Sequence, residues 1–426
     1  MSAIEQHESG VRSYSRAFNT TFRTARGAWL TDVHGRDYLD FFAGAGALNY
    51  GHNHPDLKQA LIDYIAGDNI THGLDMATEA RERFIAAFHD VILKPRGLNH
   101  KILFPGPTGT NAVEAALKLA RKVTGRRTIV SFTNGFHGMT LGALGVTGNL
   151  FKRKGAGVPL NDTVFMPFEG ALGPDVDTLD ILENALTNPS SGLDKPAGVI
   201  VEAVQGEGGI NAASTEWLTR LAKLCRTHGI KLIWDDIQAG CGRTGTFFTF
   251  DGLGIEPDFV CLSKSISGYG LPMAIVLVTP DCDVFAPGEH NGTFRGNNPA
   301  FATATATLET FWRDDTFAAS VREKGDHLRK RLESIVKRVP GLEPTLRGRG
   351  MMQGVALGVP GAADEVTQEV FKHGLIMETS GPKDEVAKFL IPLTISVEDL
   401  DKGLDVFADA LVTVARKHGV DVAAAA

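Results

Sequence analysis

The sequence predicts an α/β protein with a large domain built on a mainly parallel sheet of seven strands and a smaller α+β domain built from both termini. Two observations predict this architecture. Between Lys101 and Val278, short apolar runs bounded by Gly, Pro or Asp alternate with amphipathic helical patterns, which is typical of parallel strands covered by helices. Beyond about Asn298, long helical patterns are followed by short strands. The 426 residues are enough for two to three domains of ordinary size.

Seven apolar runs predict the strands of the large sheet, in the order Lys101–Phe104, Thr128–Phe132, Thr163–Met166, Gly198–Val204, Ile230–Trp234, Phe259–Leu262 and Ala274–Val278. The first run passes through Gly106 and Gly109 into an amphipathic helix, which gives the order strand, glycine turn, helix. After Val204, a second helix has Ser214 or Thr215 as its N-cap and Gly229 just past its end.

The smaller domain is predicted from two parts of the chain. Its C-terminal part has helices at Pro299–Trp312 and Thr316–Arg338, strands at Val355–Gly358, Leu375–Glu378 and Phe389–Ile391, and a final helix at Val397–Lys417. Its N-terminal part has alternating apolar residues between Trp29 and Phe41. We therefore expect residues 1–55 to join the small domain, residues 56–298 to form the large domain and residues 299–426 to complete the small one.

The composition is that of an ordinary globular protein, with 43% hydrophobic and 22% charged residues. The 43 Lys and Arg against 50 Asp and Glu give a net charge of −7, which argues against a nucleic-acid or anionic membrane partner. No stretch approaches the ~18 uninterrupted apolar residues of a membrane span. The four cysteines form no C-x-x-C pair, so we expect neither disulfides nor a metal site. These features predict a cytoplasmic protein with small-molecule substrates.

Polar and reactive side chains follow four of the predicted strands. Asp235 comes after Trp234, Lys264 stands two residues past Leu262, Gly109 and Thr110 follow Phe104, and the run from Gly198 contains Glu202. Ligands of an open parallel sheet bind outside the carboxyl ends of its strands, so these groups are expected to face one crevice. Each also has an ordinary structural interpretation, as a helix N-cap, a solvated lysine or a plain glycine turn.

The glycine turn at Gly109 and Thr110 can bind a phosphate, since a helix N-terminus offers free N–H groups and a positive dipole end. The turn lacks the lysine of a Walker A loop and the G-x-G-x-x-G of a dinucleotide site. Pyridoxal phosphate fits better, because it needs a lysine for a Schiff base, an acid for its pyridine nitrogen, a phosphate site and an aromatic ring to stack on. Lys264, Asp235 and Phe136 supply the other three groups.

The motifs resemble the class III aminotransferases over essentially the whole chain. The resemblance is carried by Gly35–Phe41, by Gly51–Pro55, by Asp235–Gly245, which reads DDIQAGCGRTG, and by the lysine motif Ser263–Ser265. It implies the fold of the fold type I pyridoxal phosphate enzymes. It also implies an enzyme that transfers an amino group.

The resemblance implies a role for each matching residue. Lys264 forms the Schiff base with the cofactor and moves the proton, while Asp235 pairs with the pyridine nitrogen. The other implied cofactor contacts are Gly109 and Thr110 at the phosphate, Phe136 as the stacking ring beside His137, Glu202 at the floor of the site and Gln238 near the ring hydroxyl.

Two further matches concern the subunit partner and the substrate. Thr293 matches a threonine that reaches the phosphate of the neighbouring subunit, so a homodimer is the expected minimum active unit. Glu207 matches a glutamate that pairs with an arginine in related ω-aminotransferases, where the pair moves to admit either an amine or a dicarboxylate. Lys388 stands in the place of that arginine here, and a lysine holds its partner without the two-pronged geometry of a guanidinium.

Within the family, Phe41–His52, Asp235–Arg243 and Ser265–Pro272 resemble the members that act on L-2,4-diaminobutyrate. This resemblance implies transfer of its terminal amine to 2-oxoglutarate, giving L-aspartate 4-semialdehyde and L-glutamate, or the reverse as the first step of ectoine synthesis. The alternatives are another ω-aminotransferase acting on ornithine, 4-aminobutyrate or a polyamine, and an aminomutase or racemase on the same fold. A metabolite-binding protein without catalysis is a further alternative.

Overall fold

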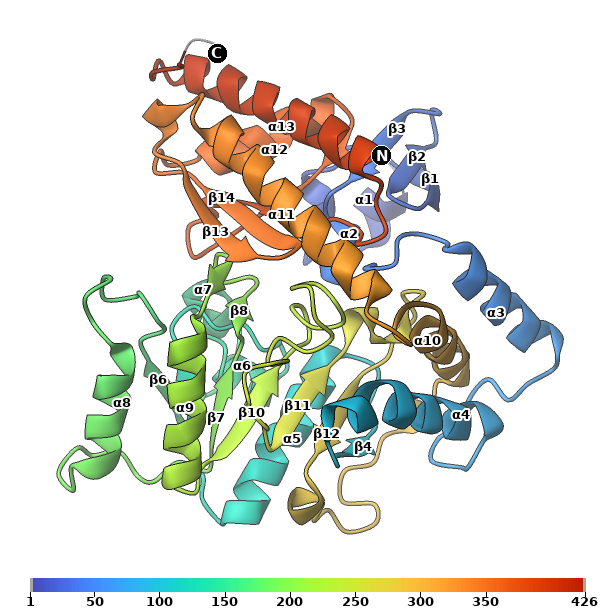
Figure 1. Cartoon of the computed structure of the whole chain (residues 1–426), viewed down its shortest axis with the longest axis vertical. Coiled ribbons are helices and arrows are strands. Elements are labelled where there is room, and N and C mark those ends of the chain that lie inside the picture. Colours follow the sequence, from blue (N-terminus) through green and yellow to red (C-terminus); the bar gives the residue numbers. More distant parts are fainter. Residues whose placement is uncertain (1–2, 424–426) are drawn as a thin grey trace.

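The computed structural model describes residues 3–423, and the predicted domains extend beyond this range by two residues at one end and three at the other. Its central element is a mixed sheet of seven strands in the order β4-β12-β11-β10-β7-β5-β6 (Figure 1). The strands are β4 (Lys101–Leu103), β5 (Ile129–Phe132), β6 (Thr163–Met166), β7 (Gly198–Val201), β10 (Lys231–Asp235), β11 (Phe259–Leu262) and β12 (Ile275–Val278). Only β12 runs against its neighbours β11 and β4. The predicted, mainly parallel seven-stranded sheet is confirmed.

Successive residues of these strands enter two different hydrophobic clusters. Ile233 packs against α5 (Gly109–Thr124), whereas Leu232 and Trp234 join the cluster that contains α9 (Thr215–Thr227). Side chains of a strand alternate between its two faces, so helices cover both sides and the strands read as continuous apolar runs. In α9, the Ser214 side chain accepts a hydrogen bond from the backbone N–H of Trp217 at 3.2 Å, as the N-cap prediction required.

A second, four-stranded sheet has the order β13-β14-β17-β16. Its strands are β13 (Thr345–Arg349), β14 (Met352–Ala356), β16 (Glu378–Ser380) and β17 (Val386–Phe389). It shares a hydrophobic cluster with the long helices α11 (Thr316–Val336) and α13 (Val397–Lys417) and with α12 (Ala362–Lys372). Figure 1 shows these helices gathered on one side of the molecule, away from the seven-stranded sheet.

The N-terminal strands β1 (Phe22–Arg26), β2 (Trp29–Asp32) and β3 (Asp37–Asp40) form a sheet with β15 (Leu375–Ile376). Because β15 pairs with β3, in parallel direction, this sheet joins the N-terminal segment to the C-terminal part of the chain. The domain boundaries at residues 55 and 298 stay a prediction, which this pairing supports.

Three strand predictions in the C-terminal part were wrong in their bounds. The strand predicted at Phe389–Ile391 is β17, which ends at Phe389, and that predicted at Val355–Gly358 is β14, which begins at Met352. The buried Lys388 interrupts the apolar run of β17, while Leu390 and Ile391 are buried beyond the end of the strand. The run at Leu375–Glu378 is split between β15 and β16, and β13 was not predicted.

The remaining elements include a group of three helices beside β4. That group consists of α3 (Pro55–Ala66), α4 (Glu79–Phe88) and α10 (Asn298–Phe311) (Figure 1). The other helices and strands are α1 (Ala3–His7), α2 (Ala43–Gly46), α6 (Leu141–Gly145), α7 (Leu150–Lys154), α8 (Thr178–Thr187), β8 (Val204–Gln205) and β9 (Asn211–Ala212). The helical turns are η1 (Tyr14–Arg16), η2 (His89–Leu93), η3 (Lys94–Arg96), η4 (Lys264–Ser267), η5 (Pro280–Cys282), η6 (Thr293–Arg295) and η7 (Pro340–Leu342). Across residues 3–423, no helix has both the length and the apolar character needed to cross a membrane.

Candidate active site

A cavity of about 180 Å³ opens where β10 and β11 end and α5 begins. It brings together side chains that the chain keeps far apart, in agreement with the rule that parallel strands present ligand sites at their carboxyl ends. Its lining residues are Gly109, Thr110, Phe136, His137, Gly138, Glu202, Glu207, Asp235, Ile237, Gln238 and Lys264. Every site residue predicted from the sequence is among them except Thr293.

Lys264 stands in η4, directly after β11, with a left-handed backbone (φ 52°). A lysine in this region is strained, and such strain concentrates at functional sites. The serines on either side fix the turn: the Ser263 hydroxyl donates to the Met273 carbonyl at 2.9 Å, and that of Ser265 to the Gly46 carbonyl at 2.8 Å. Burial lowers the pKa of the Lys264 amine to about 8, although the nearby Glu207 carboxylate opposes this effect. An amine with this pKa is a better nucleophile at neutral pH than an ordinary lysine.

Asp235 ends β10 and is held from two sides. Nδ1 of His137 donates a hydrogen bond to its Oδ2 at 2.7 Å, and the backbone N–H of Ile237 donates to its Oδ1 at 3.1 Å. Both the aspartate and the histidine are buried. Burial disfavours the charged imidazole, but the hydrogen bond and charge of Asp235 outweigh it and raise the pKa of His137. The pair therefore presents an oriented carboxylate to the cavity.

The N-terminus of α5 forms another wall. This 16-residue helix begins at Gly109, and the side chain of Asn111 accepts from the backbone N–H of Thr108 at 3.1 Å in a capping box. A Cβ added at Gly109 would lie 3.1 Å from the side chain of Ile237, so a glycine lets the helix end approach that wall closely. The first N–H groups of a helix and its dipole together attract an anion.

Two apolar side chains, Phe136 and Ile237, line the cavity between these polar groups. Glu202 lies beneath, where its carboxylate accepts from the backbone N–H groups of Phe136 at 3.0 Å and Gly206 at 3.1 Å. Burial raises the pKa of Glu202 to about 7. Gln238 donates through Nε2 to the Ala45 carbonyl at 2.9 Å, but its buried Oε1 has no partner among the described residues. The unpaired Oε1 of Gln238 could therefore accept a hydrogen bond from a donor group on a bound ligand.

The predicted pair of Glu207 and Lys388 is present, and a third side chain joins it. Lys388 Nζ lies 2.8 Å from Oε1 of Glu207 and 2.7 Å from Oε1 of Glu378, and the Lys388 side chain is fully buried. Burial alone would raise the pKa of Glu207, but the Lys388 charge holds it at about 2. Burial raises the pKa of Glu378 to about 7 despite the same lysine. The sequence analysis missed Glu378, which belongs to no motif and is placed only by the pairing of β16 with β17.

Thr293 is the predicted residue that the structure does not bring to the cavity. It lies in η6 with an exposed side chain, and Phe294 beside it is 68% exposed. Sequence reasoning also missed Ile237, although it lies inside the DDIQ motif two residues after Asp235.

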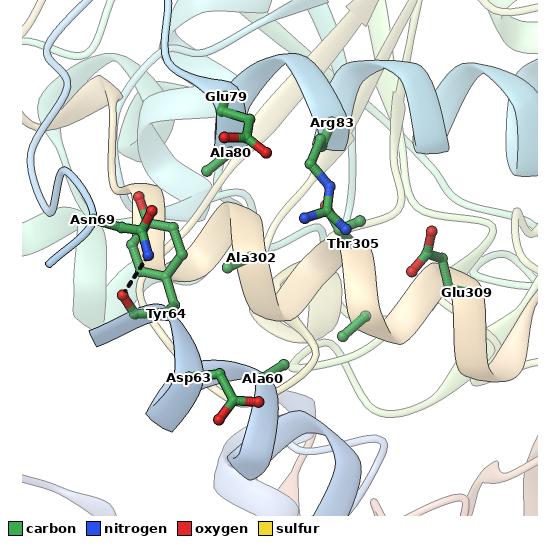
Figure 2. A pocket seen from close by; sticks show the side chains of 11 residues that line it. Ala60, Asp63, Tyr64, Asn69, Glu79, Ala80, Arg83, Ala302, Thr305 and Glu309 are labelled. Atoms are coloured by element: carbon green, nitrogen blue, oxygen red, sulfur yellow. Dashed lines mark hydrogen bonds between the residues drawn. The ribbon is translucent and has the colours of Figure 1, made fainter. Parts of the chain in front are cut away.

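A larger cavity of about 410 Å³ lies between α3, α4 and α10. Figure 2 shows its small floor residues Ala80 and Ala302 and its charged rim of Asp63, Glu79, Arg83 and Glu309. It is lined by no lysine and by none of the predicted site residues. The reactive groups therefore belong to the smaller cavity.

The family model for class III aminotransferases matches residues 11–411, and the chain belongs to that family. Among known relatives, the diaminobutyrate–2-oxoglutarate transaminase of Halalkalibacterium halodurans is 58% identical over 411 residues. The match covers 96% of this chain and 96% of that protein. The enzyme of the same name from Nocardia farcinica is 58% identical over 416 residues, which are 98% of this chain and 95% of that protein. These matches confirm the family resemblance.

Solved structures agree with the fold. An ornithine aminotransferase from Toxoplasma gondii superimposes with a TM-score of 0.84 at 26% identity, covering 98% of this chain and 94% of the other. An S-selective transaminase from Arthrobacter sp. has a TM-score of 0.85 at 20% identity and covers 97% of each chain.

As a class III aminotransferase, the chain uses pyridoxal phosphate and moves an amino group between an amino donor and a 2-oxo acid. The cavity fits this cofactor. It combines a lysine with a lowered pKa, a buried carboxylate, a helix N-terminus and an orphaned Gln238 acceptor within one space. The predicted cofactor and enzyme class are confirmed.

Proposed function

We propose that the chain transfers the terminal amine of L-2,4-diaminobutyrate to 2-oxoglutarate, giving L-aspartate 4-semialdehyde and L-glutamate, or runs the reverse reaction. The main support for this proposal comes from the relatives. Proteins that are 52% to 58% identical to this chain over nearly their full length are all named for that one reaction. In the reverse direction the product is L-2,4-diaminobutyrate, which supports the expected place at the first step of ectoine synthesis.

Lys264 and Asp235 are proposed as the catalytic residues. Pyridoxal phosphate, when bound, supplies an aldehyde for amine exchange and a ring that withdraws electrons from the carbon that carries the amine. The Lys264 amine, with a pKa of about 8, exists partly in its neutral form at neutral pH, so Nζ can both accept and return a proton. The Asp235 carboxylate, oriented by His137, would hold a proton on the ring nitrogen of the bound cofactor.

The other lining residues bind and orient. The N–H groups at Gly109 and Thr110 would hold the phosphate, and Phe136 and Ile237 would enclose the cofactor ring and exclude water. Gln238 offers its free Oε1, and Glu202 fixes the backbone of Phe136 from below. Glu207 lies at the side of the cavity that is left for the substrate.

We also propose a homodimer as the minimum active unit. Thr293 is exposed and does not line the cavity of its own chain, which supports a role for it at the phosphate of a second copy. The exposed apolar side chains of Phe294, Met139 and Leu141 support the burial of these segments in such a contact. A cytoplasmic location stays a prediction, supported by four cysteines that are all free and buried.

The proposed reaction is tested with the purified, cofactor-loaded enzyme. Incubation with L-glutamate and L-aspartate 4-semialdehyde should release 2-oxoglutarate, at a rate well above that with the aldehydes derived from ornithine or 4-aminobutyrate. If one of those aldehydes reacts equally fast or faster, that aldehyde and not L-aspartate 4-semialdehyde is the substrate. If no aldehyde gives 2-oxoglutarate, the proposal is overturned. An aminomutase would convert its single substrate without any 2-oxo acid.

A further inference from the structure

The cluster of Glu207, Lys388 and Glu378 contains two carboxylates and one ammonium. Lys388 Nζ is within 2.8 Å of one carboxylate oxygen of each acid. When both acids are ionised, the cluster therefore carries one unit of excess negative charge. An uncompensated charge in a buried place is costly, so the excess favours a cation brought by a ligand.

The three side chains differ in their access to the cavity. Lys388 and Glu378 stand directly opposite each other on β17 and β16, with side-chain exposures of 0% and 6%. Glu207 lies in the loop after β8, is 15% exposed and lines the cavity. The lysine is thus fixed within the sheet by Glu378, and only the Glu207 carboxylate faces the substrate.

Unsatisfied polar atoms mark the same place. Neither Oε2 of Glu378 nor the hydroxyl of Ser380, two residues further on the same face of β16, has a hydrogen-bond partner among residues 3–423. Glu207 exerts the largest charge effect on Lys264, the reactive amine of the cavity. The reacting end of a substrate and the Glu207 carboxylate therefore occupy one continuous space.

We propose that Glu378 is a specificity-determining residue that retains Lys388 in the sheet, so that Lys388 contacts only Oε1 of Glu207 and the other oxygen of this carboxylate can bind the second ammonium group of a diamino acid. This inference rests on the proposed function, because L-2,4-diaminobutyrate carries such a group while 2-oxoglutarate carries two carboxylates. Without Glu378, Lys388 pairs with Glu207 alone and the cluster becomes neutral. Cationic substrates then bind less well and dianionic substrates bind better.

The titration of Glu378 agrees with this role. Burial raises the pKa of Glu378 to about 7, and the Glu207 charge adds to this effect while the charges of Lys388 and Lys264 oppose it. An ammonium group bound at Glu207 would add a further positive charge that favours the ionised form of Glu378.

The test compares the two substrates of one reaction in the holoenzyme variants Glu378→Gln and Glu378→Met. In a ping-pong reaction, kcat/KM for each substrate reports on its own half-reaction. We expect kcat/KM for L-2,4-diaminobutyrate to fall at least tenfold, while kcat/KM for 2-oxoglutarate is unchanged or rises. The control is Glu385→Gln on the same hairpin, whose carboxylate lies 3.7 Å from Arg347 and outside the cluster. It should leave both values within about twofold.

A merely structural role of Glu378 would lower both values together, and that outcome would overturn the proposal. An unchanged kcat/KM for L-2,4-diaminobutyrate would also overturn the proposal. If neither variant accumulates as folded holoenzyme, Glu378 is an acid required for folding and the proposal is wrong. Failure of the proposed function is distinguishable, since it appears as a wild-type enzyme without activity towards L-2,4-diaminobutyrate.

Discussion

His137 donates a hydrogen bond from Nδ1 to Oδ2 of Asp235 at 2.7 Å, and both side chains are buried. The two residues are separated by 98 positions, and the end of β10 meets the segment after β5 at this contact. The hydrogen bond fixes the direction of the carboxylate, and the imidazole keeps it from being an unpaired buried charge. Together with the backbone N–H of Ile237, the imidazole therefore holds the Asp235 carboxylate in one orientation.

Replacing Asp235 by Asn should lower kcat by about 10²- to 10³-fold, which is typical of the loss of one oriented electrostatic contact in a closed site. Asparagine keeps the shape of the side chain, but it cannot hold the charge that stabilises a protonated ring nitrogen. Steady-state rates check this expectation. Asp236→Asn is the matched control, because Asp236 faces Thr249 and not the cavity. Equal losses in the two variants would contradict the role of Asp235.

Capture of pyridoxal phosphate by the apoenzyme should accelerate about fivefold between pH 7 and pH 8, and less than twofold from pH 8 to pH 9. The pKa of Lys264 is lowered to about 8. The fraction of Lys264 that is neutral and nucleophilic therefore rises steeply between pH 7 and pH 8, and it approaches its maximum between pH 8 and pH 9. Stopped-flow absorbance of the cofactor measures the rate. A rate that continues to rise tenfold per pH unit up to pH 10 would show an ordinary lysine instead.

Lys388→Met should lower the free energy of unfolding by about 3–5 kcal/mol, the usual cost of removing one partner from a buried ion pair. The variant leaves the carboxylates of Glu207 and Glu378 buried without a positive partner. Chemical denaturation of the holoenzyme measures this loss. Adding Glu207→Gln and Glu378→Gln to the same chain should restore part of the stability. If the triple variant is even less stable, packing and not charge explains the loss.

Thr293→Ala and Lys264→Ala should each abolish or strongly reduce turnover, yet mixed dimers of the two should recover activity. If Thr293 serves the neighbouring subunit, one site of the mixed dimer combines an intact Lys264 with an intact Thr293. Co-expression with two different affinity tags isolates the mixed dimer, and its rate is compared with that of each parent. No recovery would mean that Thr293 acts within its own chain or plays no part in the site.

Much of the site could be predicted from the sequence because its residues follow strands. Asp235 ends β10, and Lys264 stands two residues after β11. In a parallel sheet, the chain order of apolar runs implies one shared edge, and the residues after each run are then brought together. The D-D-I-Q and S-K-S motifs added the identity of the chemistry, since each required residue type stands at a fixed spacing.

The small domain was harder to predict because its short strands mix polar and apolar residues. β17 contains Lys388, a charged residue that interrupts the apolar pattern of the strand although its side chain is fully buried in the fold. Only the register of β16 against β17 places Glu378 opposite Lys388, and that register depends on a five-residue connection, 381–385, whose conformation no motif specifies.

The sequence by itself determined the α/β class, the positions of the seven strands along the chain and the lysine, aspartate and glycine turn of the candidate site, because these follow from periodicity and local spacing. Tertiary structure alone decided that a second acid shares Lys388 and that Thr293 lies away from the cavity of its own chain. Charge pairing between short strands and the direction of an exposed loop depend on contacts between distant segments. No local pattern encodes such contacts.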